Sequence, residues 1–233
     1  DDCAVENGPL QGVAVTFAAR RGTTLHQACA ATDQQNGTYN CSTTSQGTWN
    51  FGRYNTTMNA TKNYYNASLT VTQTPSFLLV SNPQISNPGS SSSSLGGGAS
   101  NNGWGERWTF TADVLDSDQS AAELNEVLNI TLWINRSTGW QLVNQTLCPG
   151  PLLSDCSSSV QASFTQQVFA CEDIGSRTFR FNVTDAYQYE NQTSATAAIA
   201  KDSVFIQYIY GDSNVDREGS TAARLVIRVQ DTD

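Results

Sequence analysis

Apolar and polar residues alternate with a period of two along much of the chain. Successive side chains of a β-strand point to opposite faces, so this alternation predicts strands with one buried and one exposed face. Six segments show the pattern: residues 13–17, 49–54, 108–114, 130–134, 179–183 and 225–229. Continuous apolar runs at residues 77–80 and 204–210 predict two further, buried strands. Helical periodicity is almost absent, and the pattern therefore predicts an all-β fold.

A stretch rich in serine, glycine and asparagine, residues 86–103, interrupts the predicted strands. Such a composition favours a flexible coil over packed structure, so it predicts a linker. The 233 residues then divide into two domains of ordinary size. We expect antiparallel β-sandwich modules at residues 1–85 and 104–210, followed by a linker and a C-terminal strand at residues 211–233.

The two predicted modules share an internal repeat. Thr16 in the segment AVTF corresponds to Thr131 in NITL, a shift of 131 − 16 = 115. Cys41 and Cys171 each precede a Thr-aromatic-x-Phe strand, at a shift of 171 − 41 = 130. The apolar run at residues 77–80 also pairs with the run that begins at Val204. These matches follow the same order in both halves, and loops absorb the difference in spacing.

One more match joins the second module to the end of the chain. The segment RWTFTADVLDSD at residues 107–118 is similar to RLVIRVQDTD at residues 224–233. Val114 and Val229 are again 115 residues apart. Nothing before Val13 is similar to this segment, so the first module is predicted to lack its opening strand. The spare copy consists mainly of Arg224, Leu225, Val226, Ile227, Arg228 and Val229.

The strands WTFTADVLDSD, NITLWIN and TFRFNVTD resemble those of immunoglobulin-like or cadherin-like modules. The displaced strand resembles the donor strand of pilus and related extracellular fibre subunits. This resemblance implies two Ig-like antiparallel β-sandwiches, the first lacking one strand. It further implies a filament subunit that polymerises head-to-tail with itself, by inserting its C-terminal strand into the N-terminal module of the next copy.

Three alternatives to strand exchange remain open at this point. The C-terminal strand can fold back onto its own module as an ordinary last strand. The chain can be one unit of a longer tandem polypeptide. It can also be a monomeric surface or S-layer-type adhesion module that binds a protein or a glycan.

Ten asparagines stand in Asn-x-Ser/Thr sequons, the acceptor sequence for N-linked glycans. They are Asn36, Asn40, Asn55, Asn59, Asn66, Asn129, Asn135, Asn144, Asn182 and Asn191. An occupied site must face solvent, so the sequons predict parts of the outer surface. Together with the lack of a leader or a run of ~20 apolar residues, they predict a processed, secreted cell-surface glycoprotein that does not insert into a membrane.

The six cysteines contain no C-x-x-C pair, so zinc-ribbon and thioredoxin-like interpretations have no support. An even number of cysteines beside many sequons predicts disulfides formed in an oxidising compartment. Six cysteines can form three disulfides in fifteen ways, and the sequence alone does not choose among them. The internal repeat suggests one of these pairings. It pairs Cys29 with Cys41 and Cys148 with Cys171, and leaves Cys3 with Cys156.

Charge and the residue types needed for catalysis argue against two classes of function, nucleic-acid binding and enzymatic activity. The net charge is −9 and Lys62 and Lys201 are the only lysines, so no basic patch for nucleic acid is expected. His26 is the only histidine, and no catalytic constellation stands out, so we do not expect an enzyme. No cofactor is predicted beyond covalent glycans. Asp116 and Asp118 are candidate calcium ligands, although the incomplete cadherin-like motif favours a solvated acidic turn.

Overall fold

The computed structural model describes residues 8–65, 71–93, 102–166, 168–201, 204–211 and 224–231. Its regular structure is nearly all β, which confirms the predicted all-β fold class. The chain divides into two compact units. Unit 1 consists of Asp1–Ser81 and Asp118–Glu126, and unit 2 of Asn82–Ser117 and Val127–Asp233.

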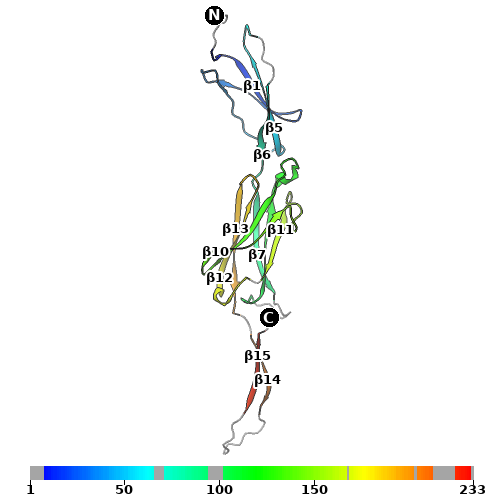
Figure 1. Ribbon diagram of the computed structural model, residues 1–233, viewed down its shortest axis with the longest axis vertical. Helices are drawn as coiled ribbons and strands as arrows, with labels where there is room; N and C mark the ends of the chain where they lie inside the picture. Colours follow the sequence, from blue (N-terminus) through cyan, green and yellow to red (C-terminus); the bar gives the residue numbers. More distant parts are fainter. Residues whose placement is uncertain are drawn as a thin grey trace, which may run out of the picture. The chain divides into compact units, whose positions relative to one another are not determined.

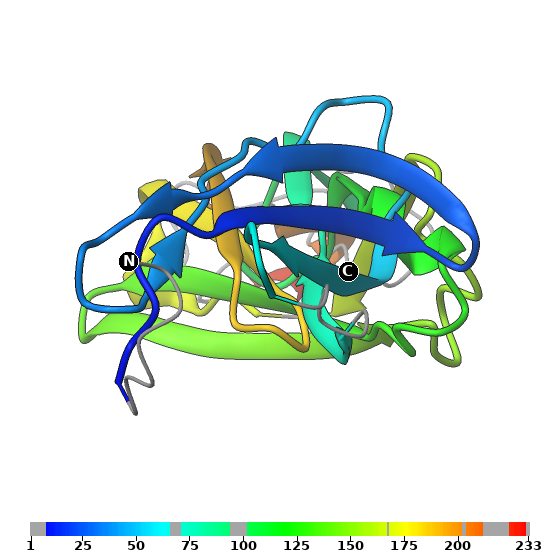
Figure 2. The same ribbon diagram turned by 90° about the horizontal axis from the view of Figure 1, so that it is seen from above.

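Unit 1 is built on one antiparallel sheet with the strand order β2-β1-β5-β6. The strands are β1 (Ala14–Arg21), β2 (Thr24–Ala30), β5 (Gly52–Thr61) and β6 (Val71–Leu79). In Figure 2, β1 and β2 run side by side as two blue strands. A separate short ladder joins β3 (Thr32–Asp33) to β4 (Tyr39–Asn40).

One face of the unit 1 sheet is largely apolar along β1. Alternation along β1 places Val15, Phe17 and Ala19 on the same face. The register sets Phe17 opposite Met58 and Ala19 opposite Thr56 of β5. We call this side of the sheet the open face. In the described part of unit 1, the only other sheet is the two-stranded β3-β4 ladder, so more is missing than the single strand predicted.

Unit 2 is a two-layer sandwich (Figure 1). One sheet has the order β10-β9-β12-β13 and the other the order β11-β8-β7. The strands are β7 (Gln84–Ser93), β8 (Arg107–Leu115), β9 (Leu128–Arg136), β10 (Gly139–Cys148), β11 (Val160–Gln166), β12 (Gly175–Thr184) and β13 (Glu190–Ile199). The described residues also include the short 3-10 helices η1 (Ser117–Ser120) and η2 (Cys171–Asp173).

The two layers of unit 2 enclose a contiguous apolar core. Alternate residues of β9 and β8 enter it from opposite sheets: Leu128, Ile130, Leu132 and Ile134, and Trp108, Phe110, Ala112 and Val114. The ring of Phe110 meets that of Phe179 edge-on at 5.0 Å between centroids, a preferred aromatic geometry. Packing of this kind between two inner faces is what stabilises a β-sandwich.

The prediction of a linker over residues 86–103 is wrong for residues 86–93, which belong to strand β7. Ser90, Ser91 and Ser92 pair through their backbones with β8. Ile85 anchors the start of β7 in the core. A serine run forms a strand here because its partner β8 supplies the hydrogen bonds, whereas composition reports only the side chains. Residues 94–101 lie outside the described residues.

The strands β14 (Val204–Gly211) and β15 (Leu225–Asp231) form a two-stranded antiparallel sheet, drawn as a ribbon in Figure 1. Gly211 lies opposite Leu225 and Ile206 opposite Val229. Within the described residues these strands pair only with each other. We call the pair the terminal hairpin. The prediction of a buried strand at residues 204–210 is therefore wrong, and the C-terminal strand is paired rather than single.

The internal repeat appears as a shared strand order. The sheets β2-β1-β5-β6 and β10-β9-β12-β13 each place their second strand at one edge, followed by the first, third and fourth. This agrees with the predicted match between Thr16 on β1 and Thr131 on β9. The counterpart of β6 is β13, so the predicted match between the apolar run of β6 and the run of β14 is wrong.

Gly52 is the first residue of β5 and lies next to the carboxylate of Glu123. Its φ of 131° suits glycine, and a Cβ at this position would meet Glu123 Oε1. That carboxylate accepts hydrogen bonds from Arg21 Nη2 at 2.9 Å and from the Arg53 amide at 3.1 Å. The Arg21 side chain, followed by the Arg53 amide, holds the pKa of Glu123 below its usual value. Gly52 thus leaves room for Glu123, which joins the start of β5 to the 118–126 segment of unit 1.

Gly52→Ala is expected to destabilise unit 1 by about 2–4 kcal/mol, because it adds backbone strain and displaces Glu123. Gly22→Ala is the matched control, since φ is 60° but no atom lies within 4 Å of the added Cβ. Its cost should be about 1–2 kcal/mol, from strain alone. Urea denaturation of both variants measures the difference, and equal losses would contradict the role given to Glu123.

Candidate functional site

The open face of unit 1 is hollowed above Phe17 and Ala19. The hollow has a volume of about 290 Å³. Its lining residues are all uncharged: Phe17, Ala19, Gln27, Cys29, Cys41, Thr43, Thr56 and Phe77. An uncharged depression on a sheet surface suits apolar side chains of a partner better than a charged ligand.

Aromatic rings form one border of the open face. Tyr54 stacks on Phe77 at 5.1 Å between centroids and on Trp49 at 5.4 Å. The ring of His26 lies 5.1 Å from that of Tyr54. The Tyr54 hydroxyl donates a hydrogen bond of 2.8 Å to the carbonyl of Asn50, and burial raises its pKa. His26 is therefore part of an aromatic packing group.

The equivalent face of unit 2 shows what normally covers such a sheet. Val15 and Phe17 of β1 correspond to Ile130 and Leu132 of β9 at the shift of 115. In unit 2 both residues are fully buried beneath the β11-β8-β7 sheet. In unit 1 both remain partly exposed. The open face is therefore a sandwich surface without its second layer among the described residues.

One face of the terminal hairpin is apolar over most of its length. Cross-strand register places five side chains on it: Ile206, Tyr208, Leu225, Ile227 and Val229. The exposed fractions of Leu225, Ile227 and Val229 are 70%, 50% and 58%. The opposite face is mixed, with Gln207 opposite Arg228. Apolar surface of this extent usually marks a site of interaction.

Connection lengths relate the terminal hairpin to β7 and β8. Residues 80–83 connect β6 to β7 and residues 200–203 connect β13 to β14, four residues in each case. Residues 94–106 separate β7 from β8 and residues 212–224 separate β14 from β15, thirteen residues in each case. The hairpin thus follows β13 along the chain as the pair β7 and β8 follows β6.

Register extends this equivalence to individual residues. Ile85 pairs with Val114 in the sandwich, and Ile206 pairs with Val229 in the hairpin. Val114 and Val229 are the residues matched by the sequence repeat. Val114 is completely buried, whereas Val229 is exposed. The hairpin therefore presents the inward face of a sandwich layer, and no other described strand pairs with it.

Five predicted glycosylation sites lie on the sheet faces opposite the apolar ones. Asn55 and Asn59 of β5 alternate with Thr56 and Met58 of the open face. In unit 2 the sites Asn129, Asn135 and Asn182 alternate in the same way with buried core residues. These five positions therefore lie off the apolar faces of the two sheets.

The other sequons lie in varied surroundings. Asn36 and Asn40 are exposed next to the β3-β4 ladder, and Asn144 is half-buried on β10. The Asn191 side-chain amide donates a hydrogen bond of 3.2 Å to the carbonyl of Pro83. Asn66 lies outside the described residues. Glycan occupancy at all ten positions stays a prediction.

The disulfides agree only in part with the predicted pairing. Cys29 is joined to Cys41, as predicted. Cys148 is joined to Cys156 rather than to Cys171. The pairing inferred from the repeat is wrong because a nearer partner is available. Cys148 is the last residue of β10, and Cys156, eight residues further on, is buried with it in the core. Cys3, the predicted partner of Cys156, lies outside the described residues.

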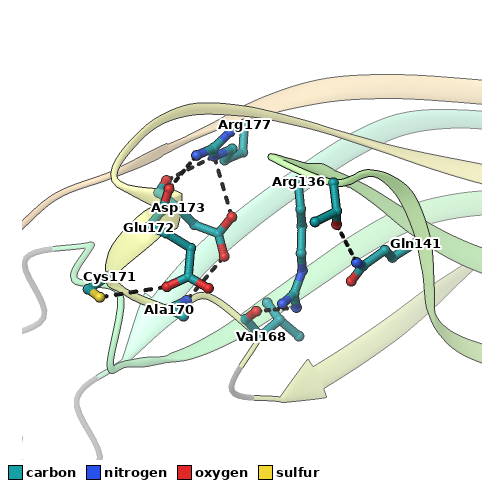
Figure 3. A network of polar contacts seen from close by, with 9 residues as sticks. Arg136, Gln141, Val168, Ala170, Cys171, Glu172, Asp173 and Arg177 are labelled. Carbon is teal, nitrogen blue, oxygen red and sulfur yellow. Dashed lines mark hydrogen bonds and ion pairs between the residues drawn. The ribbon is translucent and has the colours of Figure 1, made fainter.

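Cys171 is an exposed free thiol at the start of η2 (Figure 3). Its Sγ lies 3.6 Å from Glu172 Oε2. The Asp173 carboxylate accepts a hydrogen bond of 3.1 Å from the Ala170 amide and lies 3.6 Å from Arg177 Nε. Arg177 also donates to the Glu172 carbonyl at 2.7 Å. These contacts hold η2 with the thiol facing outward.

The calcium candidates Asp116 and Asp118 are both buried, so the expectation of a solvated acidic turn is wrong. Asp118 Oδ2 accepts a hydrogen bond of 2.7 Å from the Ser81 amide. Carboxylate oxygens of Asp116 and Asp185 come within 4.8 Å of each other. Asp185 Oδ1 also accepts a hydrogen bond of 2.8 Å from the Tyr187 amide. Calcium prefers carboxylate oxygens, and its binding here stays a prediction.

No known protein family matches this sequence, and no curated protein is significantly similar to it. Among the described residues, no helix has the length and apolar character needed to cross a membrane. The two disulfides indicate an oxidising environment outside the cytosol. Function is therefore inferred from the open face and the terminal hairpin.

Alkylation of the native protein tests the disulfide pattern. A maleimide is expected to label Cys171 without reductant, because this thiol is exposed, whereas Cys148 should react only after reduction and unfolding. Non-reducing peptide mapping should then recover a peptide that links Cys148 to Cys156. A Cys148 to Cys171 linkage in the mapped peptides would refute the assignment.

Proposed function

We propose that the chain is the structural subunit of a secreted, glycosylated extracellular filament. The terminal hairpin of one copy packs on the open face of unit 1 in the next copy. One observation carries the proposal. The hairpin has the connection lengths, register and repeat position of β7 and β8, two of the three strands that cover the equivalent sheet in unit 2.

The energetics favour docking of the hairpin. Burying one Leu, Ile or Val side chain contributes roughly 1.5–3 kcal/mol. The apolar face of the hairpin offers five large side chains, and Val15, Phe17 and Met58 would lose further water contact on the open face. Association costs about 4–15 kcal/mol in lost translational and rotational freedom. The apolar side chains on both partners together can offset a cost of this order.

Head-to-tail packing explains why the assembly would be a filament. Donor and acceptor are different surfaces of the same chain, so the contact is heterologous. A heterologous contact repeats without closing unless the rotation between copies generates a ring. The sequons fit this arrangement, because Asn55 and Asn59 point away from the acceptor surface. Ten glycan sites and two disulfides suit a secreted polymer.

Ile227→Asp is expected to abolish polymerisation, because it places a charge at the centre of the apolar face of the hairpin. The matched control is Gln207→Asp, which adds the same group to the mixed face, opposite Arg228. Light scattering and negative-stain microscopy should find filaments for the control and monomers for Ile227→Asp. Filaments of normal length from Ile227→Asp would rule out docking through this face.

Phe17→Asp is expected to disable the acceptor surface, because Phe17 lines the hollow of the open face. Thr16→Asp is its control, since Thr16 is exposed on the other side of β1. The control should polymerise, and circular dichroism should show that both variants retain their β-structure. If the Phe17 variant is folded and still polymerises, the acceptor has been placed on the wrong surface.

Mixing the two defective variants separates donor from acceptor. Phe17→Asp retains a donor hairpin and Ile227→Asp retains an open face, so a 1:1 mixture should form heterodimers that cannot extend. Analytical ultracentrifugation measures the dimer, and each variant alone should remain monomeric. A mixture that stays monomeric would contradict exchange between copies and would favour a hairpin that folds onto its own chain.

A further inference from the structure

A cluster of large side chains lies on the outward face of the β10-β9-β12-β13 sheet, away from the core. The guanidinium of Arg180 lies 4.4 Å from the ring centroid of Trp140 and 5.6 Å from that of Trp133. Trp140 is exposed, and Trp133 is half-buried. We call Trp133, Trp140 and Arg180 the aromatic platform.

The platform is not explained by charge pairing or by core packing. No carboxylate in the described part of the chain forms an ion pair with Arg180, and its Nε has no hydrogen-bond partner. Trp133 alternates with the buried residues Leu132 and Ile134 and therefore faces outward. A guanidinium over two rings is held by cation–π attraction, and its remaining N–H groups can donate to a ligand.

Asn135 stands beside the platform. It lies directly opposite Trp140 in the β9-β10 register. Trp133 precedes it by two residues on the same strand, so both side chains share one face. Directly opposite residues of an antiparallel pair have Cβ atoms about 4.5–5.5 Å apart. A glycan attached to Asn135 would therefore leave the protein between two tryptophans.

We propose that the aromatic platform binds the first sugars of an N-glycan on Asn135. The apolar C–H face of a pyranose ring packs on the electron-rich face of an indole, and the Arg180 guanidinium donates to sugar hydroxyls. Covalent attachment gives the sugar a high effective concentration at the platform, so a weak stacking contact suffices. The proposal rests on the sequon at Asn135 and does not depend on filament assembly.

Ser137→Ala provides the test, because it removes the sequon and leaves Asn135 in place. The variant is produced as the full-length chain in a glycosylating host. The change is expected to lower the Tm of the unit 2 transition by about 3 °C, the shift that corresponds to the loss of one aromatic contact. In a Trp140→Ala background the same change should have almost no effect. Tryptophan emission should also shift to longer wavelength when the glycan is lost.

Asn129→Gln is the control, because Asn129 is on the same strand and face but lies opposite Leu147 and Thr184. Loss of the glycan at Asn129 should leave tryptophan emission unchanged. It should also have the same effect on Tm with or without Trp140. Equal losses of Tm for Ser137→Ala with and without Trp140 would overturn the proposal. Mass spectrometry that finds Asn135 unmodified in the wild-type chain would overturn it as well.

Discussion

A β-sheet with one apolar face is stable in water only when a second layer covers that face. Unit 2 meets this requirement within its own strands, since β8 and β9 bury alternate residues against each other. In the described part of unit 1, the sheet has no such layer. The terminal hairpin shows the opposite arrangement, a layer with an apolar face but no sheet beneath it. The proposed assembly follows because each surface supplies what the other lacks.

Five sequons of the two four-stranded sheets lie on the face opposite the apolar one. Asn59 on β5 and Asn182 on β12 both point away from the apolar face of their sheet. Glycans on that side would keep protein surfaces apart, whereas the open face of unit 1 remains accessible. In the proposal for the aromatic platform, Trp133 and Trp140 also order sugars on the outward face. A sheet with such a coat can form specific contacts through one side only.

The sequence predicted best those features that depend on side-chain alternation within one strand. The segment around Phe17 was expected to be a half-buried strand, and the spare strand at Leu225 was found by comparison with β8. Features that depend on a distant partner were missed. The serines of β7 form a strand because β8 pairs with them, and Asp116 is buried because the chain folds around it. Cys148 was assigned by analogy with unit 1, whereas its partner Cys156 is set by the loop after β10.

The hairpin form of the donor has consequences that a single strand would not have. Each strand of the hairpin satisfies backbone hydrogen bonds of the other before docking, so fewer unpaired groups are exposed in the free subunit. Docking is then mainly a packing of side chains, and its register depends on pairs such as Ile206 and Val229. The two faces also differ, since Gln207 and Arg228 lie opposite the apolar side. A ribbon that remained in solvent on both sides would gain nothing from this alternation, whereas the proposed docking would bury its apolar face.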